Sequence, residues 1–483
     1  MKILFVDVYL NIVTWEMFYN PGVASISAVL KQNHIESDHF AVFEQSDIAK
    51  LLSYIKINHF DIVGFTVTEP ILKSVSKIAS IIKKTFPKIY LVCGGLHAIL
   101  DPKELLEKIN CDAVCIGEGE YSTLKLIRYL EKKSPNIYKL SNFWFKKGNK
   151  IIKNPLDKPI DINTLPEPNR EIFYKSNLDL YLGNIYLKGG QRGCIVTLSR
   201  GCHFNCTFCA NQFLNSRYDG EYRRILDPEK AINQLKNIIK KRSYDYLIFI
   251  DPQFPTDDKW LEKFTKLYIE KIKLPFTIQI RFGSFTKNTV HLLKKAGCYF
   301  TQIGLESGDK DIRFQVLNKK IDHQMIVDGV AMFKNKHIKI GLNNMVGLPQ
   351  ETPDRFINTI QTNGYLNPDY SYIFIYYPYK GTPLYQYCLK HKLIKKHVKY
   401  FSWSKTTTLK LKIFCQKDIH FYYQNYQTLL SIFKKSLQTN KIKAFFWNKV
   451  FKLYSTPPSK RYNLNGFYAN LAQKIFFDKN NHL

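Results

Sequence analysis

Three cysteines lie within eight residues of one another, at Cys202, Cys206 and Cys209. Three thiolates on one loop can each ligate one iron of a cubane cluster. No fourth cysteine continues this spacing, so one iron would be left without a protein ligand. An open metal position is where a catalytic site binds its substrate. The spacing therefore predicts a catalytic 4Fe-4S cluster held by these three residues.

Structural zinc is the alternative for these cysteines, because Cys206-x-x-Cys209 alone is a common zinc half-site. A structural zinc ion takes four ligands from two paired half-sites. His203 is adjacent to Cys202 rather than well spaced from it, and no second cysteine pair appears. The spacing favours the cluster over zinc.

The elements before the cysteines alternate short apolar runs with helical patterns. This rhythm is typical of a doubly wound parallel sheet with helices on both faces. Ligands of such sheets bind beyond the carboxyl ends of the strands, where Gly94, Gly95 and Gly117 would let a bulky ligand approach the backbone. The expected strands are 3–8, 62–66, 89–93 and 113–116, and the expected helices are 23–33 and 72–85.

A second series of strand–helix units follows the connector and begins near residue 194. Six such units over about 190 residues are typical of a parallel barrel or partial barrel, whose chemistry lies at the strand carboxyl ends. The expected strands are 195–199, 246–251, 276–281, 299–305, 339–346 and 372–377.

The expected domain organisation has four parts. A doubly wound domain covers 1–135, and a connector at 136–187 holds a hairpin that turns near Gly148. A (β/α)6 partial barrel covers 188–385. A basic, aromatic and mainly helical C-terminal region covers 386–483.

Several segments resemble a known family. The C-x3-C-x2-C triad with Phe208 before its last cysteine is similar to the radical S-adenosylmethionine superfamily. Further segments, in the right order, are similar to the branch with an N-terminal cobalamin-binding domain. These are Phe249-Ile250-Asp251-Pro252-Gln253-Phe254, Gly304-Leu305-Glu306-Ser307-Gly308, Gly347-Leu348-Pro349-Gln350-Glu351-Thr352 and Pro378-Tyr379-Lys380-Gly381-Thr382-Pro383-Leu384, together with Gly94-Gly95-Leu96-His97 and Gly117-Glu118-Gly119-Glu120.

The resemblance implies the cofactors and their neighbours. S-adenosylmethionine would chelate the open iron, and an electron supplied by a donor such as flavodoxin or ferredoxin would cleave it to a 5′-deoxyadenosyl radical. Phe208 would lay its backbone near the adenine, and Glu306 and Ser307 would face S-adenosylmethionine. Arg281 would meet a carboxylate, and Asp251 is either a ligand contact or a cap at its strand end.

The resemblance also implies a cobalamin site at the edge of the doubly wound sheet. Gly94, Gly95, Gly117 and Glu118 would line a corrin site, with His97 as a polar contact at its rim. The Asp-x-His-x-x-Gly sequence that supplies a cobalt ligand in many cobalamin domains is absent from the loop at 9–15. Relatives in this superfamily commonly lack that histidine, and a domain without cofactor would end in similar loops.

Three functions remain open. The first is cobalamin-dependent methyl transfer to an unactivated carbon of a small or lipid-like metabolite. The second is a radical oxidoreductase that closes a ring or a carbon–carbon bond without methyl transfer, like the anaerobic porphyrin-ring cyclase. The third is nucleic-acid modification, but neither the second cluster nor the RNA-binding barrel of such relatives is visible.

Charge and hydropathy indicate the role of the C-terminal region and the location of the protein. The formal net charge is +31, and the span 384–483 holds nineteen Lys and Arg against Asp418 and Asp478. Aromatic groups at 421–423, 445–447 and 476–477 lie among these lysines, which is typical of a helical cap, a lid or a site that docks on anionic membrane lipid. No transmembrane run and no signal peptide are recognised, so we expect a cytoplasmic protein.

Overall fold

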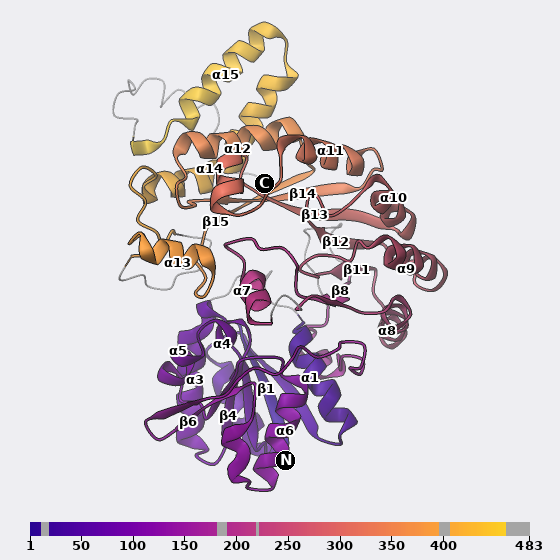
Figure 1. The fold of residues 1–483 in the computed structure, drawn as a ribbon, viewed down its shortest axis with the longest axis vertical. Helices are drawn as coiled ribbons and strands as arrows, with labels where there is room; N and C mark the ends of the chain where they lie inside the picture. Colours follow the sequence, from indigo (N-terminus) through magenta and orange to yellow (C-terminus); the bar gives the residue numbers. More distant parts are fainter. Residues whose placement is uncertain (11–18, 181–190, 219–221, 396–405, 460–483) are drawn as a thin grey trace.

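The N-terminal sheet has seven strands in the order β2-β1-β3-β4-β5-β6-β7. The computed structural model describes residues 1–10, 19–180, 191–218, 222–395 and 406–459, and Figure 1 shows the sheet at one end of the molecule. Strands β1 to β5 are parallel, which confirms the doubly wound prediction. The strands are β1 Lys2–Val8, β2 Glu36–Val42, β3 Ile62–Thr66, β4 Tyr90–Gly94, β5 Ala113–Cys115, β6 Phe143–Lys147 and β7 Lys150–Lys153.

Helices cover both faces of this sheet because successive side chains of a strand point to opposite faces. Ile3 and Phe5 of β1 pack in one cluster with helices α1 and α6, whereas Leu4 and Val6 pack in another with α2, α3 and α5. The helices are α1 Pro21–Gln32, α2 Asp47–Asn58, α3 Leu72–Thr85, α4 Leu96–Leu100, α5 Pro102–Lys108 and α6 Glu120–Glu131.

Two parts of the first sheet differ from expectation. The edge strand β2 was not expected from the sequence, because only His39 and Val42 of its seven residues are buried and its pattern is polar. The hairpin expected in the connector does form, but β6 pairs antiparallel with β5. The hairpin therefore extends the first sheet beyond residue 135, because the apolar Phe143 and Phe145 fill its core.

The second sheet has six parallel strands in the order β15-β14-β13-β12-β11-β8. Within the described residues β8 and β15 are its edges and do not pair, so the sheet is an open partial barrel, as predicted. The strands are β8 Gly193–Val196, β11 Tyr246–Phe249, β12 Phe276–Ile280, β13 Cys298–Glu306, β14 Lys339–Val346 and β15 Tyr370–Ile375. Helix α8 (Pro228–Lys241) precedes β11. Strands β11 to β14 are each followed by one helix, in order α9 Asp258–Lys271, α10 Lys287–Ala296, α11 His323–Lys334 and α12 Pro353–Leu366.

The C-terminal region is helical, as predicted. Its helices are α13 Pro383–Lys390, α14 Gln416–Gln438 and α15 Lys441–Ser455. Tyr422, Tyr426 and Phe433 of α14 are buried in one cluster with Phe356 of α12, so these aromatics serve as a cap on the barrel. Phe476 and Phe477 lie outside the described residues. No helix in the described part of the chain is long and apolar enough to cross a membrane.

Candidate functional site

The cysteine loop lies between a two-residue strand, β9 (Ser199–Arg200), and helix α7 (Ala210–Arg217). Cys206 is buried, whereas Cys202 and Cys209 are half-buried. Two side chains donate to the sulfurs: Arg281 Nη1 lies 3.6 Å from Cys206 Sγ, and Asn211 Nδ2 lies 3.7 Å from Cys209 Sγ. Hydrogen bonds to sulfur tune the potential of an iron–sulfur cluster, so the loop already presents donors to two of its three sulfurs.

The charges around the loop suit an anionic cluster. Burial raises the pKa of the Cys206 thiol, and the positive charges of Lys319 and Arg281 oppose that rise. Within the described residues, no three His, Cys, Asp or Glu side chains converge as ligands of one metal ion. A cubane makes no such demand, because each cysteine ligates a separate iron. Three cysteines on one loop, with Arg281 and Lys319 beside them, therefore fit an anionic 4Fe-4S cluster.

Asp251 follows β11 and fixes the start of the cysteine loop. Its Oδ1 accepts hydrogen bonds from Leu198 N at 2.8 Å, Ser199 N at 2.6 Å and Ser199 Oγ at 2.6 Å. Its Oδ2 has no partner among the described residues. Burial raises the pKa of Asp251 to about 6, although these hydrogen bonds oppose the rise. Asp251 therefore acts as a cap through Oδ1, and a ligand contact through Oδ2 stays a prediction.

Removing the Asp251 acceptor should loosen the cysteine loop. Asp251→Ala would leave three buried donors without a partner, at about 1–3 kcal/mol each, and should lower the iron bound after reconstitution. Asp251→Asn keeps an acceptor and should retain iron.

The same carboxyl should make stability depend on pH. Because the pKa of Asp251 in the folded protein lies above the ordinary 3.8, the stability of the wild type should fall as pH rises from about 4 to 6, and Asp251→Asn should flatten that slope. Iron analysis and urea unfolding at several pH values test both points.

Glu306 ends β13 beside the cysteine loop. It has a left-handed φ of +69° at an irregularity in the β13–β14 pairing, and Lys319 Nζ donates to its Oε1 at 2.9 Å. A Cβ on Gly304 would stand 2.1 Å from that same oxygen, so the glycine makes room for the ion pair. The charge of Glu306 is felt at Cys206 and Cys209. The structure therefore brings Glu306 to the cluster site.

Ser307, in contrast, is turned into the protein. It is fully buried; its Oγ accepts from Asp309 N at 3.2 Å and lies 3.5 Å from Thr359 Oγ1. Arg313 Nη1 donates to its carbonyl oxygen at 2.9 Å. These contacts hold the turn that follows Glu306, and the structure does not bring the Ser307 hydroxyl to the cysteine loop.

Arg281 and Phe208 were also predicted to contact S-adenosylmethionine. The Arg281 guanidinium lies 3.9 Å from the centre of the Phe204 ring and donates to Cys206, so the residue faces the cluster loop. Phe208 packs beside the turn after β13. Its neighbour Thr207 donates from N to Leu317 O and accepts at O from Leu384 N, which fixes the backbone that was predicted to meet adenine.

A cavity of about 450 Å³ lies between the two sheets. From the first sheet it is lined by Gly94, Gly95, Gly117 and Glu118, four of the five residues predicted for cobalamin. From the barrel it is lined by 197–200, the segment that leads into the cysteine loop. One cavity therefore connects the carboxyl edge of the doubly wound sheet to the approach to the cluster.

The glycines of this cavity form a bare backbone cradle. Gly95 has φ +91°, and a Cβ there would stand 2.9 Å from Val67 N; a Cβ on Gly117 would stand 2.6 Å from Asn142 Oδ1. Glycine is the residue that permits such close approach. Internal packing therefore requires both glycines, and as a result the cavity wall they form with Gly94 carries no side chains. A flat corrin needs such an edge, so the residues present fit cobalamin.

His97 lies in an adjacent cavity of about 360 Å³. It is buried, and its Nε2 lies 3.0 Å from Glu104 Oε2. Lys380, from the segment after β15, bonds the same Glu104 carboxylate and Asp101 Oδ2 at 3.0 Å. The sequence predicted a rim contact for His97 but not this link between the two sheets. His97 therefore orients Glu104 in an ion pair across the domain interface.

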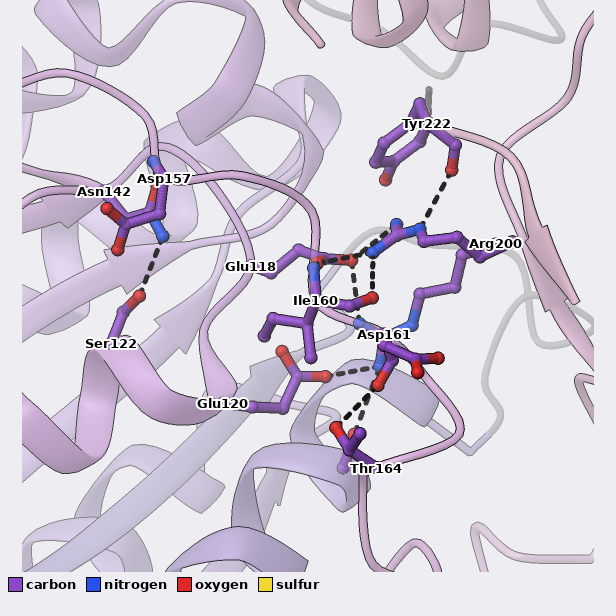
Figure 2. Close-up of polar contacts among 12 residues, drawn as sticks. Glu118, Glu120, Ser122, Asn142, Asp157, Ile160, Asp161, Thr164, Arg200 and Tyr222 are labelled. Carbon is purple, nitrogen blue, oxygen red and sulfur yellow. Dashed lines mark hydrogen bonds and ion pairs between the residues drawn. The ribbon is translucent and has the colours of Figure 1, made fainter. Parts of the chain in front are cut away.

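A second ion-pair network, which we call the Glu118 network, joins the loop after β5 to a short two-stranded sheet of β9 and β10 (Arg224–Ile225) at the wall of the cavity. Arg200 donates to Glu118 Oε1 at 2.9 Å and also to Glu120. Arg224, from strand β10, donates to both oxygens of Glu118 at 2.8 Å. Figure 2 shows Arg200 reaching toward both glutamates. Glu118 was predicted to bind cobalamin; here its carboxylate is committed to the two arginines.

Comparison with known proteins agrees with this geometry. Residues 196–362 match the radical SAM superfamily and residues 15–127 match the B12 binding domain. The chain belongs to the radical SAM (S-adenosylmethionine) superfamily, in the branch with an N-terminal cobalamin-binding domain. It is a cobalamin-dependent radical SAM enzyme, and its cofactors are a 4Fe-4S cluster, S-adenosylmethionine and cobalamin.

Relatives match along most of the chain. An uncharacterized methyltransferase of Pyrococcus horikoshii is 27% identical over 413 residues, covering 82% of this chain and 84% of that protein. The bacteriochlorophyllide d C-8(2)-methyltransferase of Chlorobaculum tepidum is 23% identical over 475 residues, covering 93% and 91%. The anaerobic magnesium-protoporphyrin IX monomethyl ester cyclase of Rubrivivax gelatinosus is 25% identical over 335 residues, covering 68% of this chain and 58% of that protein.

Solved structures share the fold. The cobalamin-dependent radical enzyme OxsB, with aqua-cobalamin and S-adenosylmethionine bound, superposes with a TM-score of 0.69 at 14% identity, covering 94% of this chain and 71% of that chain. The methyltransferase TsrM of Kitasatospora setae, with cobalamin and a [4Fe-4S] cluster, gives a TM-score of 0.64 at 14% identity, covering 80% and 77%.

Proposed function

We propose that the protein transfers a methyl group to an unactivated carbon of a small or lipid-like metabolite. The observation that carries this proposal is the cavity of about 450 Å³ that extends from the glycine cradle of the first sheet to residues 197–200 of the barrel. A methyl donor at the cradle would then lie in the cavity that leads toward the cysteine loop, where the radical would be generated. The two long methyltransferase relatives support the same reading.

The bound cofactors would supply the radical that removes a hydrogen atom from substrate and the methyl group that replaces it. The chain's own residues position them and exclude water. Arg281 and Asn211 hold the sulfurs of the cysteine loop, Lys319 orients Glu306, and the Glu118 network closes one side of the cavity. An electron donor such as flavodoxin or ferredoxin would deliver the reducing electron.

Labelled S-adenosylmethionine tests the proposal. The reconstituted holoenzyme is supplied with a chemical reductant, a candidate metabolite extract and S-adenosylmethionine carrying a trideuterated methyl group. The product should carry three deuterium atoms where its light counterpart carries three hydrogens. S-adenosylhomocysteine and 5′-deoxyadenosine should form together, because one S-adenosylmethionine gives the methyl group and another gives the radical. 5′-Deoxyadenosine that accompanies an unlabelled, oxidised product would overturn methyl transfer.

An oxidative cyclase is the second candidate. The match to the Rubrivivax gelatinosus cyclase favours it, although the chain spans only 58% of that relative. This reaction would need the same cluster and the same cavity but would place no label in product. The labelling experiment therefore separates the two functions directly.

A further inference from the structure

Helix α15 presents an outer face that the barrel does not use. Figure 1 shows α15 at the end of the molecule opposite the N-terminal sheet. Its inner face is anchored, because Phe451 is buried and Trp447 and Val450 pack against the α14 cluster. On the outer face, Phe445 is 62% exposed and Phe446 is 57% exposed. Two neighbouring phenylalanines at such exposure on a well-anchored helix call for an explanation.

The helix is strongly basic, and three of its lysines (Lys441, Lys449 and Lys452) share the side of Phe445. Lys441, Lys443, Lys449 and Lys452 are exposed, and α15 contains no acidic residue. Residues three and four apart lie on one side of a helix, so Lys441, Phe445, Lys449 and Lys452 form a stripe. Lys449 Nζ lies 4.5 Å from the centre of the Phe445 ring. The phenylalanines are thus flanked by cations whose long stems can follow an apolar surface.

We infer that this face docks the enzyme on an anionic lipid bilayer. A basic helix that presents large apolar side chains lies in the membrane interface, with its apolar groups below the headgroups and its lysines on anionic lipid. Here Phe445 and Phe446 would enter the acyl boundary, while Lys441, Lys449 and Lys452 beside them would meet the headgroups and Lys443 would add to the positive charge of the helix. This docking is independent of the proposed reaction, because α15 lines neither cavity.

Other binding partners would match either the charge or the apolar side chains of this face, but not both. A second copy of the chain would cover the phenylalanines but would bring two sets of lysines together. A duplex nucleic acid would neutralise the lysines but offers no apolar layer for the two phenylalanines, and single strands are bound in charged grooves lined by aromatics rather than on one outer helix face. An anionic bilayer accommodates the charges and the apolar rings at once.

Vesicle co-sedimentation of the full-length protein tests the docking. The probes are vesicles of phosphatidylcholine alone and of equimolar phosphatidylcholine and phosphatidylglycerol. The protein should sediment with the anionic vesicles and not with the neutral ones, and added salt should weaken binding. Replacing Lys441, Lys443, Lys449 and Lys452 by glutamine should lower the partition coefficient at least about tenfold, and Phe445→Ala/Phe446→Ala should also lower it about tenfold.

A matched variant separates this face from net charge. Glutamine at the exposed Lys259, Lys263, Lys266 and Lys271 of α9 changes the total charge by the same amount and should leave vesicle binding unchanged. Circular dichroism and 5′-deoxyadenosine formation in vesicle-free buffer should be unaltered in all variants. Equal loss in both lysine variants, equal binding to neutral vesicles, absence of binding, or binding only to a homopolymeric RNA would each overturn the inference.

Discussion

Replacing Cys206 by serine should abolish the iron–sulfur cluster and with it all cleavage of S-adenosylmethionine. Cys206 is the buried member of the triad and the sulfur that accepts from Arg281. A serine oxygen is a hard ligand where cluster iron takes soft thiolate. The remaining two thiolates cannot hold a cubane that already lacks a fourth protein ligand. Iron and sulfide analysis after anaerobic reconstitution, with 5′-deoxyadenosine as the activity readout, should show both values at background.

Cys415 provides the control for this change. It is half-buried like Cys202 and Cys209, but it lies at the start of α14, away from the loop. Cys415→Ser should keep full iron content and activity. Cobalamin binding, read from its own absorption, should survive in both variants because the cradle belongs to the other sheet. A Cys206→Ser protein that still binds iron and cleaves S-adenosylmethionine would refute the assignment of the triad.

The strands that the sequence predicted share one physical property. Runs such as 62–65 and 246–249 are fully buried and are continuously apolar, which makes them recognisable without a partner. Strand β2 has one solvated side and reads Glu36-Ser37-Asp38-His39 at its start. Nothing local distinguishes such an edge strand from a loop. Its pairing with β1 depends on the sheet that is already there.

The site residues also divide into those that local sequence predicts and those whose contacts depend on the assembled fold. The cysteines were predicted because all three ligands lie on one loop and their spacing is visible in the sequence. The partner of Glu306 is thirteen residues away, and the donors to Asp251 are more than fifty residues away. A carboxylate at a strand end indicates that it needs a partner, but only the assembled sheet decides which one. The protein partners of Ser307 and His97 were therefore not foreseen, and their contacts with S-adenosylmethionine and with the corrin rim stay predictions.

The largest effect on stability should come from the Glu118 network. Glu118 accepts four hydrogen bonds from Arg200, Arg224 and the Ile160 amide. The Glu118 and Arg224 side chains are only 9% and 13% exposed. Removing one partner of a buried ion pair leaves the other charge uncompensated, which costs about 3–5 kcal/mol. Glu118→Gln should therefore lower the free energy of unfolding by about that amount, measured by urea denaturation of the apoprotein.

Glu171 offers a closely matched control. It also joins two cations across the molecule, Lys31 of α1 at 2.9 Å and Lys241 of α8 at 2.8 Å. Its side chain is 42% exposed, so water can replace either lysine, and Glu171→Gln should cost no more than about 1 kcal/mol. The comparison isolates burial, because both variants remove one carboxylate charge that bridges two cations.

The pH dependence supplies an independent check on the Glu118 network. Burial alone would raise the pKa of Glu118, but the hydrogen bond from Arg224 and the charges of Arg200 and Arg224 outweigh it and hold the pKa below the ordinary 4.5. A carboxylate with a lowered folded pKa stabilises the fold above its unfolded pKa, and this stability is lost as pH falls through the folded value. The gap between wild type and Glu118→Gln should therefore be full at neutral pH and shrink in acid below about pH 4.5. A gap that stays constant into acid would mean that the substitution acts through packing, not through charge.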